Sequence, residues 1–160
     1  MMSTPTFVEF ETNTPAPQWT ASSTHDTLSS DQLRGKSYIL YFYPKDLTPG
    51  CTTQACDFRD NLERLSALGY QVIGVSPDSI KRHKTFQEKH QFSFALIADE
   101  DHSLATIFGV WREKKNYGRR YMGIVRSTFV VNEEGLFTEV QINVRAKGHV
   151  DRLINLLHKD

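Results

Sequence analysis

The chain has 160 residues, of which 39% are hydrophobic and 24% are charged, and its 19 Lys and Arg balance its 19 Asp and Glu. That length can bury a real core, and the composition is ordinary for a globular protein. The neutral balance, with no basic patch, argues against a nucleic-acid partner. The longest apolar run, residues 38–43, is too short to span a bilayer, so no membrane segment is expected.

The N-terminus and the cysteine count indicate a compartment. No Lys or Arg precedes Arg34, and no apolar segment follows Met1, so neither a secretory signal nor an Arg-rich transit peptide is expected. Two cysteines are too few for a secreted disulfide scaffold. We therefore expect a cytoplasmic protein, in which a close cysteine pair is catalytic or binds metal.

The order of the expected elements predicts an α/β fold. Residues 1–21, rich in Thr and Pro, are expected to be extended, and residues 1–14 are assigned to an arm on one domain that spans residues 1–160. The expected strands are residues 24–28, 37–43, 71–76, 94–97, 127–131 and 136–142, the last two joined by a hairpin turn. The expected helices are one turn at 29–35, then 48–68, about 80–90, 101–108 and 147–158. This order favours a central mixed β-sheet flanked by helices.

The most informative feature is the segment that carries both cysteines, at the start of the second expected helix. Thr48 is a preferred N-cap residue and Pro49 suits the first helical position, which places Cys51 at the third. The first N–H groups of a helix have no partners within the helix and carry a partial positive charge. A thiolate at Cys51 would be stabilised there, so the position favours a reactive sulfur.

The second cysteine lies out of reach on an intact helix. Five residues separate Cys51 from Cys56, which gives about 140° of rotation and a Cα separation of about 8.7 Å, beyond the disulfide limit of about 7 Å. A disulfide between them would require residues 52–55 to unwind, and Thr52 and Thr53 are weak helix formers. The alternative is that both are inert buried cysteines, which the capped helix start argues against.

A longer motif surrounds the pair. The string Pro44-Lys-Asp-Leu-Thr48-Pro-Gly-Cys51 resembles the Pro-x-x-x-Thr-x-x-Cys signature of peroxiredoxins, and its extension to Cys56 resembles the bacterioferritin comigratory protein, or peroxiredoxin Q, subgroup. Other similar segments are Asp99-Glu-Asp-His102, Phe108-Gly-Val-Trp111, Glu113-Lys114, Tyr117-Gly118 and Gly123-Ile-Val-Arg126-Ser-Thr-Phe129. The resemblance implies a thioredoxin-like fold with peroxiredoxin additions.

The same resemblance implies a mechanism. Cys51 would be the peroxidatic cysteine and Cys56 the resolving one, with Pro44, Thr48 and Arg126 completing the peroxide pocket. The thiolate would attack a peroxide oxygen and become a sulfenic acid, and Cys56 would condense with it to form an intramolecular disulfide. Thioredoxin or a similar dithiol would then reduce the disulfide. No cofactor or metal is expected, and a resolving cysteine in the same chain suits a monomer.

Three further features carry weaker signals. Gln54, one turn after Cys51, could support the pocket, although a solvated helix position is the simpler expectation. The segment Asp99-Glu-Asp-His102 suggests a solvated turn that leads into a helix cap rather than a metal cluster. The string Ser22-Ser-Thr-His-Asp26 replaces the hairpin Asp-Gly usual in the subgroup, which leaves the pairing of the N-terminal strand open.

Two other classes of function compete. Thioredoxin-like copper carriers use a Cys-x-x-x-Cys pair, whereas four residues separate the cysteines here, and the six histidines form no zinc motif. A protein disulfide oxidoreductase normally has Cys-x-x-Cys, which is absent. Peroxide-dependent oxidation of Cys51 would favour the peroxidase over both.

Overall fold

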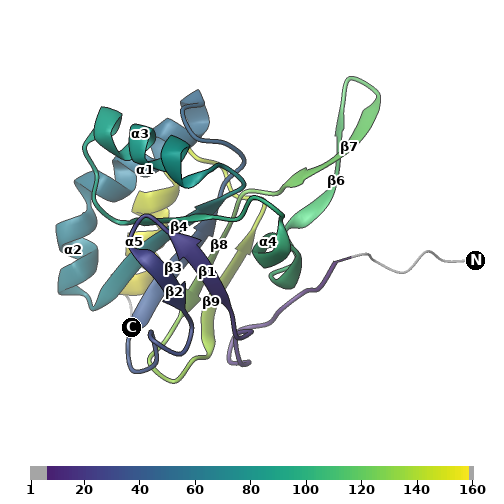
Figure 1. The fold of residues 1–160 in the computed structure, drawn as a ribbon. Helices are drawn as coiled ribbons and strands as arrows, with labels where there is room; N and C mark the ends of the chain where they lie inside the picture. The colour runs from purple at the N-terminus through teal and green to yellow at the C-terminus, as the bar shows by residue number, and fades with distance from the viewer. Residues whose placement is uncertain (1–6, 159–160) are drawn as a thin grey trace, which may run out of the picture.

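A seven-stranded mixed sheet runs through the centre of the computed structural model, which describes residues 7–158 (Figure 1). The strands in spatial order are β2 (Asp26–Ser29), β1 (Thr20–Ser23), β5 (Ala95–Ala98), β4 (Tyr70–Ser76), β3 (Ser37–Phe42), β8 (Ser127–Val131) and β9 (Phe137–Ile142). β3, β4 and β5 are parallel, and the outer strands pair antiparallel to their neighbours. The predicted central mixed β-sheet flanked by helices is confirmed.

Helices cover both faces of this sheet (Figure 1). They are α1 (Pro49–Asp60), α2 (Leu62–Ala67), α3 (Ile80–His90), α4 (Ser103–Ile107) and α5 (His149–His158). α1, α2, α3 and α5 pack on one face, and α4 packs on the other. Across residues 7–158, no helix combines the length and apolar character needed to cross a bilayer.

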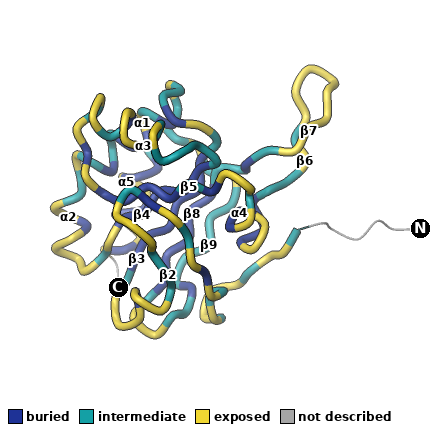
Figure 2. Tube along the Cα trace, in the orientation of Figure 1, coloured by how far each residue is buried: buried dark blue, intermediate teal, exposed yellow. Residues whose placement is uncertain are grey.

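The central strand β3 explains the long apolar run of the sequence. Ile39 and Tyr41 point to the helical layer of α1, α3 and α5, whereas Leu40 and Phe42 join the cluster under α4. All four side chains are at most 1% exposed, and Figure 2 shows the strand in dark blue at the centre. A strand buried on both faces has no polar alternation, which is why this element was predictable.

The N-terminal region differs from the prediction. β1 begins inside the segment 1–21 that was expected to be extended and runs past its end, and it pairs with β2 over four register positions from Thr20↔Ser29 to Ser23↔Asp26. Asp26 adopts a left-handed φ of 63°, and its carbonyl accepts a 2.6 Å hydrogen bond from the Ser23 hydroxyl. This turn replaces the glycine of the usual hairpin. The helical turn expected at 29–35 is instead a run of hydrogen-bonded turns.

The arm itself is only partly described, because residues 1–6 of the predicted 1–14 segment lie outside the described residues. From residue 7 onward the segment packs on the body of the protein. The Phe10 ring lies 5.1 Å from that of Phe137, centroid to centroid. Asn13 and Thr14 exchange backbone hydrogen bonds of 2.7 and 3.0 Å with Phe137. This part of the arm therefore covers one end of β9.

Two further departures concern helix and hairpin boundaries. The helix expected over 48–68 is broken at Asn61, whose side-chain amide donates a 2.8 Å hydrogen bond to the Asp57 carbonyl and competes with the helical pattern. The strands β6 (Trp111–Asn116) and β7 (Arg119–Ile124) were not predicted. They form a separate hairpin that projects from the body and is largely exposed (Figures 1 and 2).

His149 ties the start of α5 to the sheet beside the helix that carries the cysteines. Its ring is buried, with Nε2 2.9 Å from the Thr128 hydroxyl and the ring edge against Phe58. Burial, with smaller contributions from Arg152 and Arg126, lowers the pKa of His149 from 6.5 to about 4. Between pH 6.5 and about pH 4 the His149 imidazole is therefore neutral in the folded protein but binds a proton in the unfolded chain.

This histidine predicts an acid sensitivity. Because the folded-state pKa lies below the unfolded one, its contribution is fully present above pH 6.5 and is lost as the pH falls toward 4. The loss should amount to about 3 kcal/mol of the free energy of unfolding. His149→Gln, which keeps a nitrogen near Thr128, should show a flatter pH dependence in urea titrations over this range. An identical acid slope in both proteins would contradict the assignment.

Candidate active site

The predicted site residues gather where β3 gives way to α1. β3, β4 and β5 end at the same edge of the sheet, as the carboxyl ends of parallel strands must. The chain leaves β3 through residues 43–48, and Thr48 is the N-cap of α1, with φ −86° and ψ 154°. Pro49 opens the helix as predicted, so Cys51 lies in its first turn. The local order strand, loop, helix is confirmed.

Cys51 lies against a guanidinium that comes from 75 residues further along the chain. Its side chain is 2% exposed, and the Arg126 Nη2 atom donates to Cys51 Sγ at 3.2 Å. Arg126 lies between β7 and β8 and is half-buried. Gly50 leaves room for it, since a Cβ there would lie 3.3 Å from Nη2. The sulfur is therefore buried beside a positive charge.

Gln54 completes this contact. It is 0% exposed, and its Oε1 accepts a 2.5 Å hydrogen bond from Arg126 Nη1, the second arm of the same guanidinium. Its Nε2 is buried with no hydrogen-bond partner among residues 7–158. The expectation of a solvated helix position was wrong, and Gln54 is the pocket residue that sequence reasoning undervalued. The signal available was its position three residues after Cys51, on the same side of the helix.

Thr48 and Pro44 lie in the loop before the helix. The Thr48 hydroxyl donates to the Lys45 carbonyl at 2.9 Å and makes no capping bond to the helix backbone. With its proton engaged, the oxygen keeps lone pairs that can accept a hydrogen bond from a peroxide. Pro44 is half-buried at a bend directly after the strand. Both stand in the loop that precedes Cys51, as the sequence predicted.

Cys56 lies on the same unbroken helix. α1 runs without interruption from residue 49 to 60, both cysteines are free, and Cys56 is half-buried. Ala55 and Phe58 beside it belong to the core, with 0% exposure. The helical turn between the two sulfurs would have to open before they could join.

Three stacked aromatic rings, those of Tyr41, Tyr43 and Phe58, pack at this helix. The Tyr41 ring stacks on Phe58 at 4.5 Å between centroids and on Tyr43 at 5.4 Å. Burial raises the pKa of Tyr41 well above its ordinary value, and the nearby Cys51 and Asp46 add to the rise. The phenol therefore stays neutral, and its oxygen has no hydrogen-bond partner among the described residues. These rings pack in the same buried cluster as Cys51 and place no second charge beside it.

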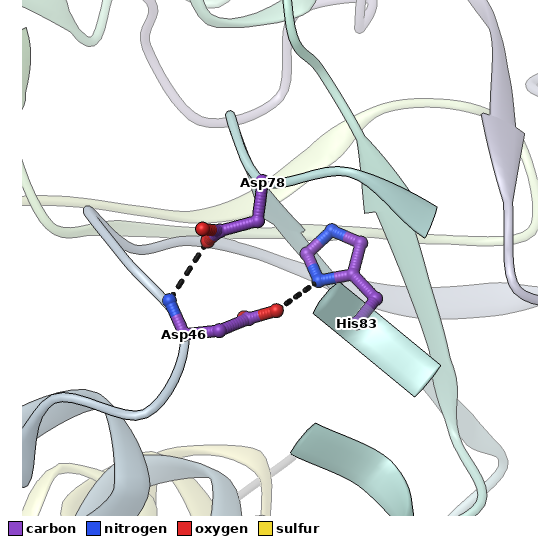
Figure 3. Close-up of side chains that lie close together, drawn as sticks. All are labelled: Asp46, Asp78 and His83. Atoms are coloured by element: carbon purple, nitrogen blue, oxygen red, sulfur yellow. Dashed lines mark hydrogen bonds and ion pairs between the residues drawn. The ribbon is translucent and has the colours of Figure 1, made fainter. Parts of the chain in front are cut away.

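Two other polar groups were candidates for metal binding. Asp99 was expected in a solvated turn, but it is 5% exposed and accepts hydrogen bonds from the backbone N–H groups of Leu104 and Ala105 at 2.9 and 2.8 Å. It caps α4, so the helix-cap expectation is confirmed. Asp46, Asp78 and His83 bring ligand atoms within 4.8 Å of one another (Figure 3), but His83 Nδ1 is already paired with Asp46 Oδ2, and Asp78 Oδ2 already accepts from the Asp46 backbone N–H.

The comparisons with known proteins agree with this geometry. Residues 12–140 match the AhpC/TSA family. The chain is 48% identical over 132 residues to the peroxiredoxin Bcp of Bacillus subtilis (strain 168), covering 82% of this chain and 84% of that protein. It is 40% identical over 125 residues to the peroxiredoxin Bcp of Escherichia coli (strain K12), covering 78% and 80%.

Comparison with solved structures also finds proteins of this kind. A cysteine-to-serine mutant of the Xylella fastidiosa PrxQ superimposes with a TM-score of 0.89 at 29% identity, covering 95% of this chain and 98% of that one. The bacterioferritin comigratory protein of Xanthomonas campestris gives a TM-score of 0.83 at 36% identity, covering 88% and 90%. The chain belongs to the AhpC/TSA family as a peroxiredoxin of the bacterioferritin comigratory protein, or peroxiredoxin Q, group. It is a thiol-dependent peroxidase.

The contact between Gln54 and Arg126 generates a prediction. Gln54→Leu keeps the side-chain volume but removes the acceptor that orients the guanidinium. We expect the second-order rate constant of Cys51 with hydrogen peroxide to fall about tenfold, or about 1.4 kcal/mol, when it is measured by stopped-flow in single turnover. The melting temperature should be unchanged or higher, because a buried unpartnered N–H is lost.

The matched control is Asp60→Asn, an exposed change at the far end of the same helix, which should leave the rate unaltered. If Gln54→Leu reacts with peroxide as fast as the parent protein, Gln54 does not support the pocket.

Proposed function

We propose that Cys51 is the peroxidatic cysteine and that Cys56 resolves it within the same chain. The observation that carries this proposal is the 3.2 Å contact between Arg126 Nη2 and Cys51 Sγ at the start of α1. A thiolate held there is supported by a guanidinium and by the unpartnered N–H groups of the first helical turn. The arrangement suits attack on a weak O–O bond.

In the first step the Cys51 thiolate attacks the nearer oxygen of a hydroperoxide. A sulfur–oxygen bond forms, the O–O bond breaks, and the distal oxygen leaves with the electron pair. Arg126 stabilises the charge on the leaving oxygen, which takes up a proton to become water or an alcohol. The Thr48 oxygen accepts a hydrogen bond from the attacked hydroperoxide, and Pro44 shields the sulfur from bulk water. Cys51 is left as a sulfenic acid.

In the second step the first turns of α1 unwind. The Cys56 thiolate then attacks the Cys51 sulfur, a disulfide forms, and hydroxide leaves as water after taking a proton. Thr52 and Thr53 lie between the two sulfurs and lower the cost of unwinding. A dithiol, which we propose to be thioredoxin or a similar protein, then returns the disulfide to two thiols through a mixed disulfide.

The substrate class follows from the relatives. The solved structure of the Xanthomonas campestris bacterioferritin comigratory protein is described in terms of its alkyl peroxide reduction activity. We propose that this chain reduces hydrogen peroxide and organic hydroperoxides. We also propose that residues 1–160 work as one domain and as a monomer, since both cysteines needed for turnover lie in a single helix, and that the protein is cytoplasmic.

Mass measurement of three proteins tests the roles of the cysteines. One equivalent of hydrogen peroxide should remove two hydrogen atoms from the wild type, because an intramolecular disulfide forms. Cys56→Ser should gain oxygen as sulfenic or higher acids, since the intermediate is not resolved. Cys51→Ser should not react. An equal rate of oxidation in Cys51→Ser and the wild type would overturn the assignment.

A further inference from the structure

A network of buried polar side chains lies beside the loop between β3 and α1 (Figure 3). Asp46 and His83 are both 0% exposed, and His83 Nδ1 lies 2.6 Å from Asp46 Oδ2. The Tyr43 hydroxyl donates to the other carboxylate oxygen, Oδ1, at 2.5 Å. His83 Nε2 lies 2.8 Å from the Ile97 carbonyl oxygen. Because a carbonyl only accepts, Nε2 carries a proton, and the imidazole faces Asp46 with a fixed orientation.

The backbone of Asp46 is held as firmly as its side chain. Its N–H donates to Asp78 Oδ2 at 2.7 Å, the contact drawn in Figure 3, and its carbonyl accepts from Arg82 Nη2 at 3.1 Å. Ser76 donates to the same Asp78 oxygen at 2.6 Å. Asp46 is thus bonded through its backbone N–H, its backbone carbonyl and both carboxylate oxygens. These bonds come from Tyr43 directly after β3, from Asp78 in the turn before α3, and from Arg82 and His83 at the start of α3.

The residues on either side of Asp46 connect its position to the candidate active site. Leu47 has a left-handed φ of 67°, which a branched side chain adopts rarely and only when its surroundings impose it. The Lys45 carbonyl accepts the Thr48 hydroxyl proton at 2.9 Å and so sets the direction of the Thr48 lone pairs. Asp46 lies between these two positions, so a shift of its carboxylate would move both.

Neither metal binding nor simple stabilisation accounts well for the network. A metal ion held by Asp46, Asp78 and His83 would have to displace the contact between His83 Nδ1 and Asp46 Oδ2. The Asp78 carboxylate already accepts from the Asp46 backbone N–H, and its Oδ1 lies 3.0 Å from Arg82 Nε. A purely stabilising role is also weak, because a buried pair of polar side chains often stabilises a fold less than apolar side chains of the same size would.

We propose that His83 and Asp46 are positioning residues for peroxide attack, which act by fixing the loop that orients Thr48. The inference rests on the function proposed above. His83 Nδ1 holds Asp46, Asp46 holds the Lys45 carbonyl and the strained Leu47, and these hold the Thr48 oxygen that accepts from the peroxide. The nucleophile itself, on α1 beside Arg126, does not depend on this chain of contacts.

The two ring nitrogens of His83 allow a matched pair of variants. The amide nitrogen of Asn lies close to the place of Nδ1 and can still donate to Asp46, whereas that of Gln lies close to the place of Nε2 and can donate only toward Ile97. Both variants are made in the Cys56→Ser protein, so that Cys51 is the only thiol. Lys84→Gln, an exposed change on the same helix, is the control.

Two rates are measured: the oxidation of Cys51 by hydrogen peroxide and its alkylation by iodoacetamide, which needs no peroxide pocket. We expect His83→Gln to slow oxidation at least tenfold, while His83→Asn recovers most of that loss and alkylation stays within threefold in every variant. In a Thr48→Val protein, His83→Gln should lower the oxidation rate by less than a further threefold.

If His83→Gln does not fold, Tyr43→Phe decides the question, since it removes one hydrogen bond to Asp46 at constant shape; it should slow oxidation at least threefold and spare alkylation. The inference is overturned if the folded variants keep the parent oxidation rate, if oxidation and alkylation fall together, or if the loss is as large in Thr48→Val. A parent protein whose Cys51 does not react with peroxide would instead overturn the proposed function.

Discussion

The contact between the Arg126 guanidinium and the Cys51 sulfur is the interaction on which the site depends. Cys51 packs in the same buried cluster as Tyr41, Ala55 and Phe58. The Arg126 guanidinium places a positive charge 3.2 Å from the sulfur. The second arm of the guanidinium donates to Gln54. The helix α1 therefore carries both the Cys51 nucleophile and the side chain that orients Arg126.

The arrangement of the sheet brings the Arg126 guanidinium to Cys51. Arg126 lies between the projecting hairpin and the start of β8. β8 pairs with β3, and β3 leads through the loop to α1. The Arg126 carbonyl accepts a 2.9 Å hydrogen bond from the Val144 N–H, which ties it to the chain beyond β9. The two halves of the pocket therefore come from neighbouring strands of one sheet. A change in the register of β8 against β3 would separate them.

The loop before α1 has to stay rigid, whereas α1 itself has to unwind during the proposed reaction. The loop around Asp46 is held by four hydrogen bonds, two of them fully buried, whereas the helix that follows it has to open by more than a turn for Cys56 to reach Cys51. The break at Asn61 limits the helix that must rearrange to residues 49–60, since α2 forms a separate segment. Rigid recognition and local unfolding are thus placed in adjacent segments of the chain.

The sequence predicted the elements whose signals are local. β3 was visible as a continuous apolar run, the start of α1 from Thr48 and Pro49, and the paired cysteines from their spacing. The family resemblance placed the distant Arg126 in the pocket of Cys51, but the other contacts between distant segments were not visible. Nothing in the order of residues places Arg126 against Gln54, or His83 against Asp46, because those pairs depend on the assembled sheet. The hairpin of β6 and β7 lacked the apolar alternation that marks a strand, since it projects into solvent and buries little.

The most direct test of the central contact is the rate at which hydrogen peroxide oxidises Cys51 in an Arg126→Met protein, measured by stopped-flow in a Cys56→Ser background. Met keeps an unbranched, apolar stem but carries no charge and no donor. The account predicts that the second-order rate constant falls at least a hundredfold, or about 2.7 kcal/mol, with the fold intact by circular dichroism. A rate constant within threefold of the parent value would show that the sulfur reacts without its guanidinium.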